Sequence, residues 1–172
     1  MAGITRLEPS HRKDYLRSGI NLIQANINNI QINEAKEVIP MIDIQYTIET
    51  EQYGNKTGNR LFIPANIFRK GFTTPDLKQR VQDIHINYGY LDTDSICLQI
   101  PEGYTIESLP KTCQVTSSFG SFSSSLMIKD KEICIIHRLL MHRGIYPKEI
   151  YKDFLEFRKQ IAAQYSSKII LK

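Results

Sequence analysis

The chain has 172 residues, of which 41% are hydrophobic and 23% are charged, and its 22 basic and 18 acidic residues give a net charge of +4. This composition is ordinary for a soluble globular domain, and a domain of this length buries about 70% of the surface that its unfolded chain exposes. The basic residues form no block of five or more and fit no nucleic-acid-binding motif, so we expect no nucleic acid as a partner.

Neither a membrane segment nor a metal-binding cysteine pattern is evident. No run reaches the roughly 18 to 20 apolar residues of a membrane span, and residues 1–10 lack the charged start and apolar core of a secretion signal. We therefore expect no membrane span and no export signal within this chain. The chain has three cysteines, an odd number, and they lack C-x-x-C spacing: Cys97, Cys113 and Cys134. We expect no disulfide framework and no zinc site, but buried, inert thiols within strands.

The N-terminal part predicts one helix and one irregular strand. Residues 9–17 predict a short helix with Ser10 as its N-cap and Gly19 at its end. Apolar residues, among them Ile23, then lie among asparagines and glutamines over residues 22–32. This mixture indicates an edge-like or bulged strand.

Residues 41–49 alternate between apolar and polar side chains, which predicts a half-buried antiparallel strand. The glycine- and asparagine-rich segment 51–59 predicts a loop that joins this strand to residues 60–64 in a long hairpin. Over residues 65–75 the alternation stops. We expect there a crossing loop whose apolar side chains close one end of the core, namely Ile67, Phe68 and Phe72.

Alternation resumes over residues 80–88 and continues through residues 91–110, which predict a strand, a tight turn and a second strand. The turn is Pro101-Glu102-Gly103, because proline fixes φ and glycine accepts a positive φ. Two further strands follow over residues 113–119 and 122–128.

The last part predicts a central strand and a covering helix. Residues 133–141 are apolar on both faces apart from His137 and Arg138, which indicates a strand covered on each side. For Arg138 we favour a structural ion pair with an acid, with ligand contact as the alternative. Apolar residues recur at helical spacing over residues 147–165, and residues 169–171 predict a short last strand.

The predicted fold class is therefore mainly β: an antiparallel β-sandwich with one long C-terminal α-helix, residues 147–165, packed on a sheet. We expect one domain over residues 1–172, in which residues 1–20 are a helical lead-in or a linker. No repeat and no internal boundary is evident.

No pattern of residues indicates catalysis. Cys134 and His137 are three apart on one strand and so point to opposite faces, which argues against a catalytic pair. The four histidines are scattered and none has metal-ligand spacing. We predict no catalytic, cofactor-binding or metal site and no cofactor. The residues that we favour for a binding surface are aromatic: Tyr53, Tyr88 and Tyr90.

Several motifs together carry a family resemblance: Asp94 to Pro110, Ser118-Phe119-Gly120, His137-Arg138, and Gly144 to Pro147 followed by Tyr151, Phe154 and Phe157. With these motifs, residues 61–172 resemble the C-terminal domain of uncharacterised transglutaminase-like proteins of the Bacteroidetes type. In that family a β-domain and a papain-related core precede this segment, and the core holds the catalytic residues. None of those residues has a counterpart here.

The resemblance implies a non-catalytic accessory domain of an exported protein, periplasmic or at the cell surface. Its partner would be the transglutaminase-like core of the same polypeptide, which it packs against or supplies with a binding surface. The alternative is an independent carbohydrate- or protein-binding module, for which a patch formed by Tyr53, Tyr88 and Tyr90 would be the evidence.

Overall fold

The computed structural model describes residues 4–22, 24–68, 74–75, 77 and 80–172, so Ile23 and Phe72 lie outside the described residues. The chain divides into two compact units, residues 1–55 with 67–70 and residues 56–66 with 71–172. We expected one domain, and no shift in composition indicated this division.

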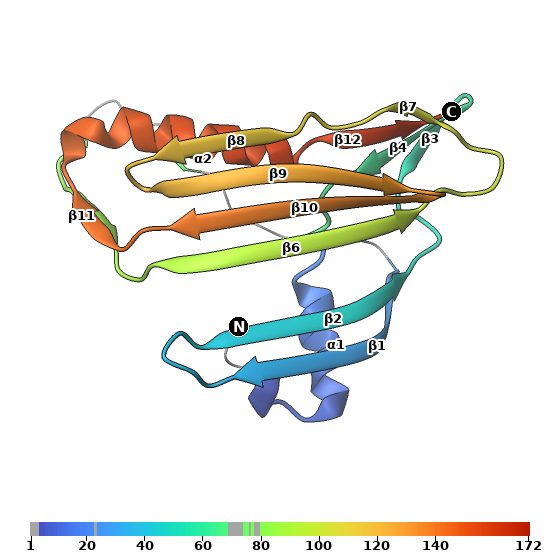
Figure 1. Ribbon diagram of the computed structural model, residues 1–172, viewed down its shortest axis with the longest axis horizontal. Helices are drawn as coiled ribbons and strands as arrows, with labels where there is room; N and C mark the ends of the chain where they lie inside the picture. Colours follow the sequence, from blue (N-terminus) through green and yellow to red (C-terminus); the bar gives the residue numbers. More distant parts are fainter. Residues whose placement is uncertain (1–3, 23, 69–73, 76, 78–79) are drawn as a thin grey trace. The chain divides into compact units, whose positions relative to one another are not determined.

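The first unit begins with two helices, η1 (Ile4–Arg6) and α1 (Pro9–Ser18) (Figure 1). The predicted N-terminal helix is thus confirmed. Proline occupies the first position of α1, where its missing N–H removes no helical hydrogen bond. Glu8 stands at the N-cap without a side-chain cap bond, so the prediction that Ser10 caps the helix was wrong. Gly19 ends the helix as predicted, and its N–H donates to the Leu16 carbonyl at 3.0 Å.

The first unit also holds a two-stranded antiparallel sheet of β1 (Asn26–Ala35) and β2 (Met41–Glu49). The bounds of β2 are those predicted, and Ile42, Ile44, Tyr46 and Ile48 share the half-buried face. The register of β1 shifts between Asn28 and Gln31, where Asn29 has a φ of 53°. Asparagine tolerates this left-handed conformation better than most residues. The predicted irregular strand is confirmed, although it begins at Asn26.

One four-stranded sheet of the second unit has the order β3-β4-β12-β7. The chain reverses tightly between β3 and β4, where Gly58 has the positive φ, 59°, that a short hairpin turn requires. The predicted long hairpin between residues 41–49 and 60–64 was therefore wrong, because β2 pairs with β1. The strands are β3 (Asn55–Thr57), β4 (Arg60–Pro64), β12 (Lys168–Leu171) and β7 (Ile106–Ser108).

The main sheet of the second unit has the order β6-β10-β9-β8. Its central strand β10 is paired without a break over all ten of its residues with β6 on one side and β9 on the other. The strands are β6 (Tyr90–Gln99), β10 (Glu132–Met141), β9 (Gly120–Lys129) and β8 (Cys113–Ser117); β5 (Ile84–Ile86) and β11 (Gly144–Tyr146) pair separately.

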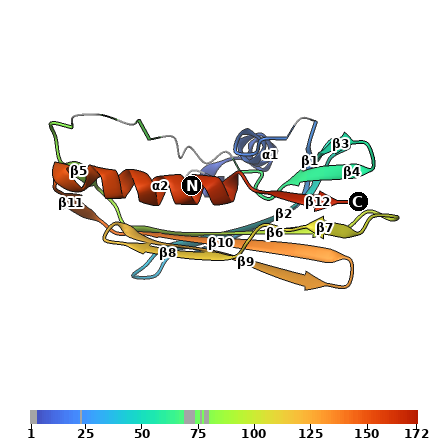
Figure 2. The same cartoon turned by 90° about the horizontal axis from the view of Figure 1, so that it is seen from above.

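Helix α2 (Tyr151–Tyr165), preceded by η2 (Lys148–Ile150), lies along one face of the main sheet (Figure 2). We call this the inner face and the opposite one the outer face. The helix begins later than predicted, because Pro147 precedes a 3-10 turn. Among the described residues, no helix is long and apolar enough to cross a membrane. The buried core between helix and sheet comprises Ile84, Phe119, Phe122, Leu139, Met141, Tyr151, Leu155, Phe157, Ile161 and Tyr165.

The expected fold class is confirmed: the structure is mainly β, its sheets are antiparallel, and one long C-terminal helix packs on a sheet. The expectation that β10 is covered on both faces was wrong. Its inner-face residues are buried, whereas Arg138 and Leu140 on the outer face are exposed. The outer face is therefore the part of the main sheet that remains available for contact.

We expect Gly120→Ala to lower the free energy of unfolding by about 3 kcal/mol or more. Gly120 has a φ of 149°, and a Cβ there would lie 1.9 Å from the Leu140 carbonyl oxygen of β10. Gly103→Ala is the matched control, because Gly103 also has a positive φ, 83°, but a Cβ there meets nothing within 4 Å. It should cost about 1 to 2 kcal/mol. Equal losses in urea unfolding would contradict the close packing of β9 on β10.

Candidate functional site

The outer face of the main sheet combines apolar side chains with hydroxyl groups. Leu91, Met127 and Leu140 are 51%, 57% and 37% exposed, which is unusual for positions that normally alternate outward as polar residues. On this face, residues of β6, β10 and β9 that are directly opposite one another form rows across the three strands. In the order β6, β10, β9 the rows are Leu91, Leu140 and Ser121; Thr93, Arg138 and Ser123; Ser95, Ile136 and Ser125; and Cys97, Cys134 and Met127.

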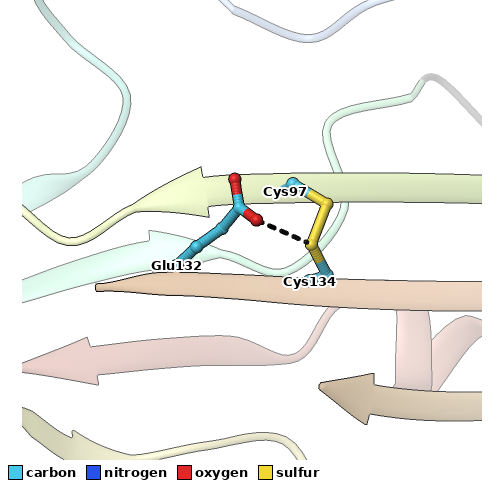
Figure 3. Close-up of side chains that lie close together, drawn as sticks. All are labelled: Cys97, Glu132 and Cys134. Atoms are coloured by element: carbon cyan, nitrogen blue, oxygen red, sulfur yellow. Dashed lines mark hydrogen bonds between the residues drawn. A yellow bond between two sulfur atoms is a disulfide. The ribbon is translucent and has the colours of Figure 1, made fainter. Parts of the chain in front are cut away.

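Cys97 and Cys134 form a disulfide across two strands of the outer face (Figure 3). The two residues are directly opposite in the register of β6 and β10, with their Cα atoms 4.1 Å apart. The expectation of inert free thiols was therefore wrong for this pair. Cys113 is a free cysteine, and burial raises the pKa of its thiol although a hydrogen bond with the backbone of Ser124 opposes the shift. That thiol stays protonated and poorly reactive.

A carboxylate lies beside the disulfide. Glu132 Oε2 is 3.7 Å from Cys134 Sγ (Figure 3). The Gln99 amide donates to Glu132 Oε1 at 3.2 Å. Gln99 thereby fixes one carboxylate oxygen and leaves the other directed at the sulfurs. The ligand atoms of Cys97, Glu132 and Cys134 all lie within 4.8 Å of one another. Two cysteines and a glutamate can hold a metal ion once the sulfurs are reduced.

Arg138 lies at a shallow depression of about 260 Å³ on the outer face. Its side chain is exposed, and within the described part of the chain no carboxylate is at ion-pair distance from it. The expected structural ion pair was therefore wrong. Arg138 instead offers an accessible guanidinium to a ligand or partner. The depression is lined by Leu91, Gln114, Ser121, Phe122, Ser123, Arg138 and Leu140.

The inner face carries a polar row beneath helix α2. Asp94 of β6, His137 of β10 and Ser124 of β9 are directly paired neighbours, and Cys113 of β8 continues the row. These residue types serve hydrolytic triads elsewhere. Here His137 is only 1% exposed, and the rings of Phe122 and Tyr165 pack against it at 5.8 and 4.9 Å between centroids.

This row is part of the core rather than an open cleft, because its histidine and serine are buried. The thiol of Cys113 and the imidazole of His137 lie on strands separated by β9, about two strand spacings or 10 Å apart. A thiol, an imidazole and a carboxylate are thus not brought into mutual contact here. His137 and Cys134 face opposite sides of the sheet, as their spacing predicted.

The three tyrosines favoured as a binding surface differ in their surroundings. Tyr88 is 82% exposed, and Tyr90, at the start of β6, is also exposed. Tyr53 belongs to the first unit and is partly buried, which raises the pKa of its phenol. Of these three tyrosines, Tyr88 and Tyr90 are exposed, and both belong to the second unit.

Comparison with known proteins gives a family but no activity. Residues 59–171 match the model of a family described as a domain of unknown function, DUF3858. The chain belongs to this family. The match covers both four-stranded sheets from β4 onward and helix α2, and it agrees with the range in which the sequence resembles an uncharacterised family domain. No curated protein and no solved structure matches the chain.

The disulfide of the DUF3858 domain is the feature that sequence reasoning missed. Both cysteines fell within predicted strands, and Cys97 alternated with outward polar residues. The missing information was the register between two strands 37 residues apart. Alternation indicates which face a residue takes, but not which residue of another strand lies opposite it.

We expect the stability of the DUF3858 domain to fall above about pH 10 and Tyr165→Phe to reduce this fall. Burial, with the nearby charges of Asp94, Asp92 and Tyr90, raises the pKa of the Tyr165 phenol above its usual value of 10.0. The unfolded chain therefore ionises first as the pH rises, and stability present at neutral pH is lost. Urea unfolding between about pH 8 and pH 11 measures this loss. Tyr88→Phe, at an exposed ring, should leave the decline unchanged, and equal declines in wild type and Tyr165→Phe would contradict the account.

Proposed function

We propose that the DUF3858 domain is a non-catalytic accessory domain of an exported protein, and that its outer face binds a transglutaminase-like core of the same polypeptide. The observation that carries this proposal is the mixed character of the outer face. Leu91 and Leu140 are directly opposite each other and exposed, next to the accessible guanidinium of Arg138. Apolar side chains rimmed by polar groups are typical of protein contact surfaces.

The main sheet suits this role because its two faces are unlike. Helix α2 covers the inner face with a continuous core, so the inner face is buried within the domain itself. The outer face is held rigid by the same ladders of β10. A rigid face loses little conformational entropy when it is bound.

The disulfide supports export to the periplasm or the cell surface. Disulfides persist in oxidising compartments and are rare in a reducing cytosol. Cys97 is exposed on the outer face and therefore accessible to reductants. An accessible pair of this kind stays bonded where the surroundings are oxidising.

An independent carbohydrate- or protein-binding module is the second candidate, and the exposed rings of Tyr88 and Tyr90 favour it. Aromatic rings contact the apolar faces of sugars and anchor protein partners. In this case the domain would bind its ligand without the core.

Expressed as separate chains, the DUF3858 domain and the transglutaminase-like core should elute together in size-exclusion chromatography with light scattering. Leu140→Asp should weaken the complex about tenfold or more, because it places a charge in the apolar part of the outer face. Ile145→Asp is the matched control: Ile145 is also exposed, at 68%, but lies on β11 outside the main sheet.

Separate elution of the two wild-type pieces would contradict the accessory role. Equal weakening by Leu140→Asp and Ile145→Asp would contradict the outer face as its location. Separate elution together with binding to a glycan column that Tyr88→Ala abolishes would establish the second candidate instead.

A further inference from the structure

We infer that the outer face, once its disulfide is reduced, binds a thiophilic divalent cation such as Zn²⁺ between Cys97, Cys134 and Glu132. This inference does not depend on the proposed function. It rests on the position of three ligand groups in a sheet whose backbone does not need the disulfide.

The backbone keeps the two cysteines together whether or not their sulfurs are bonded. Cys97 and Cys134 lie within an unbroken ladder between β6 and β10, and β9 holds β10 from its other side. A disulfide usually restrains the unfolded loop between its cysteines. Reduction therefore lowers the free energy of unfolding, but in the folded chain the ladder itself, and not the sulfur bond, keeps the two residues opposite each other at a Cα separation of 4.1 Å.

The three ligand groups lie within reach of one tetrahedral zinc ion. A zinc–sulfur bond of about 2.3 Å places two thiolates of one site about 3.8 Å apart. The ligand atoms of Cys97, Cys134 and Glu132 lie within 4.8 Å of one another, so small rotations of the cysteine side chains reach this separation.

The surroundings orient the carboxylate. Oε2 of Glu132 lies 3.7 Å from the Cys134 sulfur (Figure 3). The Gln99 amide donates to the other oxygen, Oε1, at 3.2 Å. Partners that orient a metal ligand in this way strengthen binding. Two thiolates make the ligand set soft, so it favours Zn²⁺ or Cd²⁺ over Mg²⁺ and Ca²⁺. The fourth position would be left to water or to a ligand, because Cys97 is exposed.

The chemistry balances with an external dithiol as the reductant. The dithiol transfers two electrons and two protons to the Cys97–Cys134 bond, which becomes two thiols while the dithiol becomes a cyclic disulfide. The cation then displaces the two thiol protons to the solvent and binds two thiolates and one carboxylate. The oxidised sulfurs have no thiolate to offer, so binding depends on the redox state.

Cadmium alone is the probe, added to the whole chain after reduction and anaerobic removal of the reductant. We expect a thiolate-to-cadmium charge-transfer band that saturates at one ion per chain. The oxidised chain and the Cys97→Ser variant should give no such band. Glu132→Gln should weaken binding about tenfold or more, and Gln99→Ala should weaken it by about the same factor. Cys113→Ser should bind as wild type does, because Cys113 lies on the inner face.

Loss of the band in Cys113→Ser, or an unchanged affinity in Glu132→Gln, would overturn the assigned ligand set. Circular dichroism of the reduced, metal-free chain provides the second measurement. We expect the β-sheet spectrum of the oxidised chain. An unfolded spectrum would overturn the inference, because the ladder would then not hold the two thiols together.

Discussion

The two antiparallel ladders that flank β10 are the constraint on which the rest of the second unit depends. Side chains alternate between the two faces of a sheet. The register of β10 against β6 and β9 therefore decides on which face of the main sheet each side chain of β10 lies and which residues are its neighbours. A slip of one residue would turn His137 to the outer face and bury Arg138 beneath helix α2. An unpaired arginine in an apolar core costs several kcal/mol or more, so the observed register is strongly favoured over its neighbours.

The same register gives the two faces different roles. On the inner face, apolar residues of β9 and β10 pack against the stripe of α2, and the polar row around His137 is enclosed by aromatic rings. On the outer face, the disulfide, Glu132 and the depression at Arg138 lie on strands already stabilised from the other side. The inner face thus supplies the buried core, and the outer face carries exposed side chains that the core does not use.

Local patterns predicted the elements that local interactions determine. The strict alternation of residues 41–49 gave the bounds of β2, and the apolar spacing after Pro147 indicated helix α2. What failed were pairings between distant segments. Residues 55–57 pair with β4 although no periodicity over three residues could show it, and Cys97 meets Cys134 through a register that neither strand encodes alone. We expected an ion pair between Arg138 and an acid because the sequence of its strand is apolar on both faces. In the structure only the inner face is buried, so Arg138 needs no such partner.

Peptide mapping of the unreduced protein by mass spectrometry, after alkylation of free thiols, tests the register of β10 most directly. We expect one cross-linked pair of peptides containing Cys97 and Cys134, and an alkylated Cys113. A bond between Cys113 and either of the other cysteines would contradict the account. It would require β8 or β10 to pair differently, and the division into inner and outer faces would no longer hold.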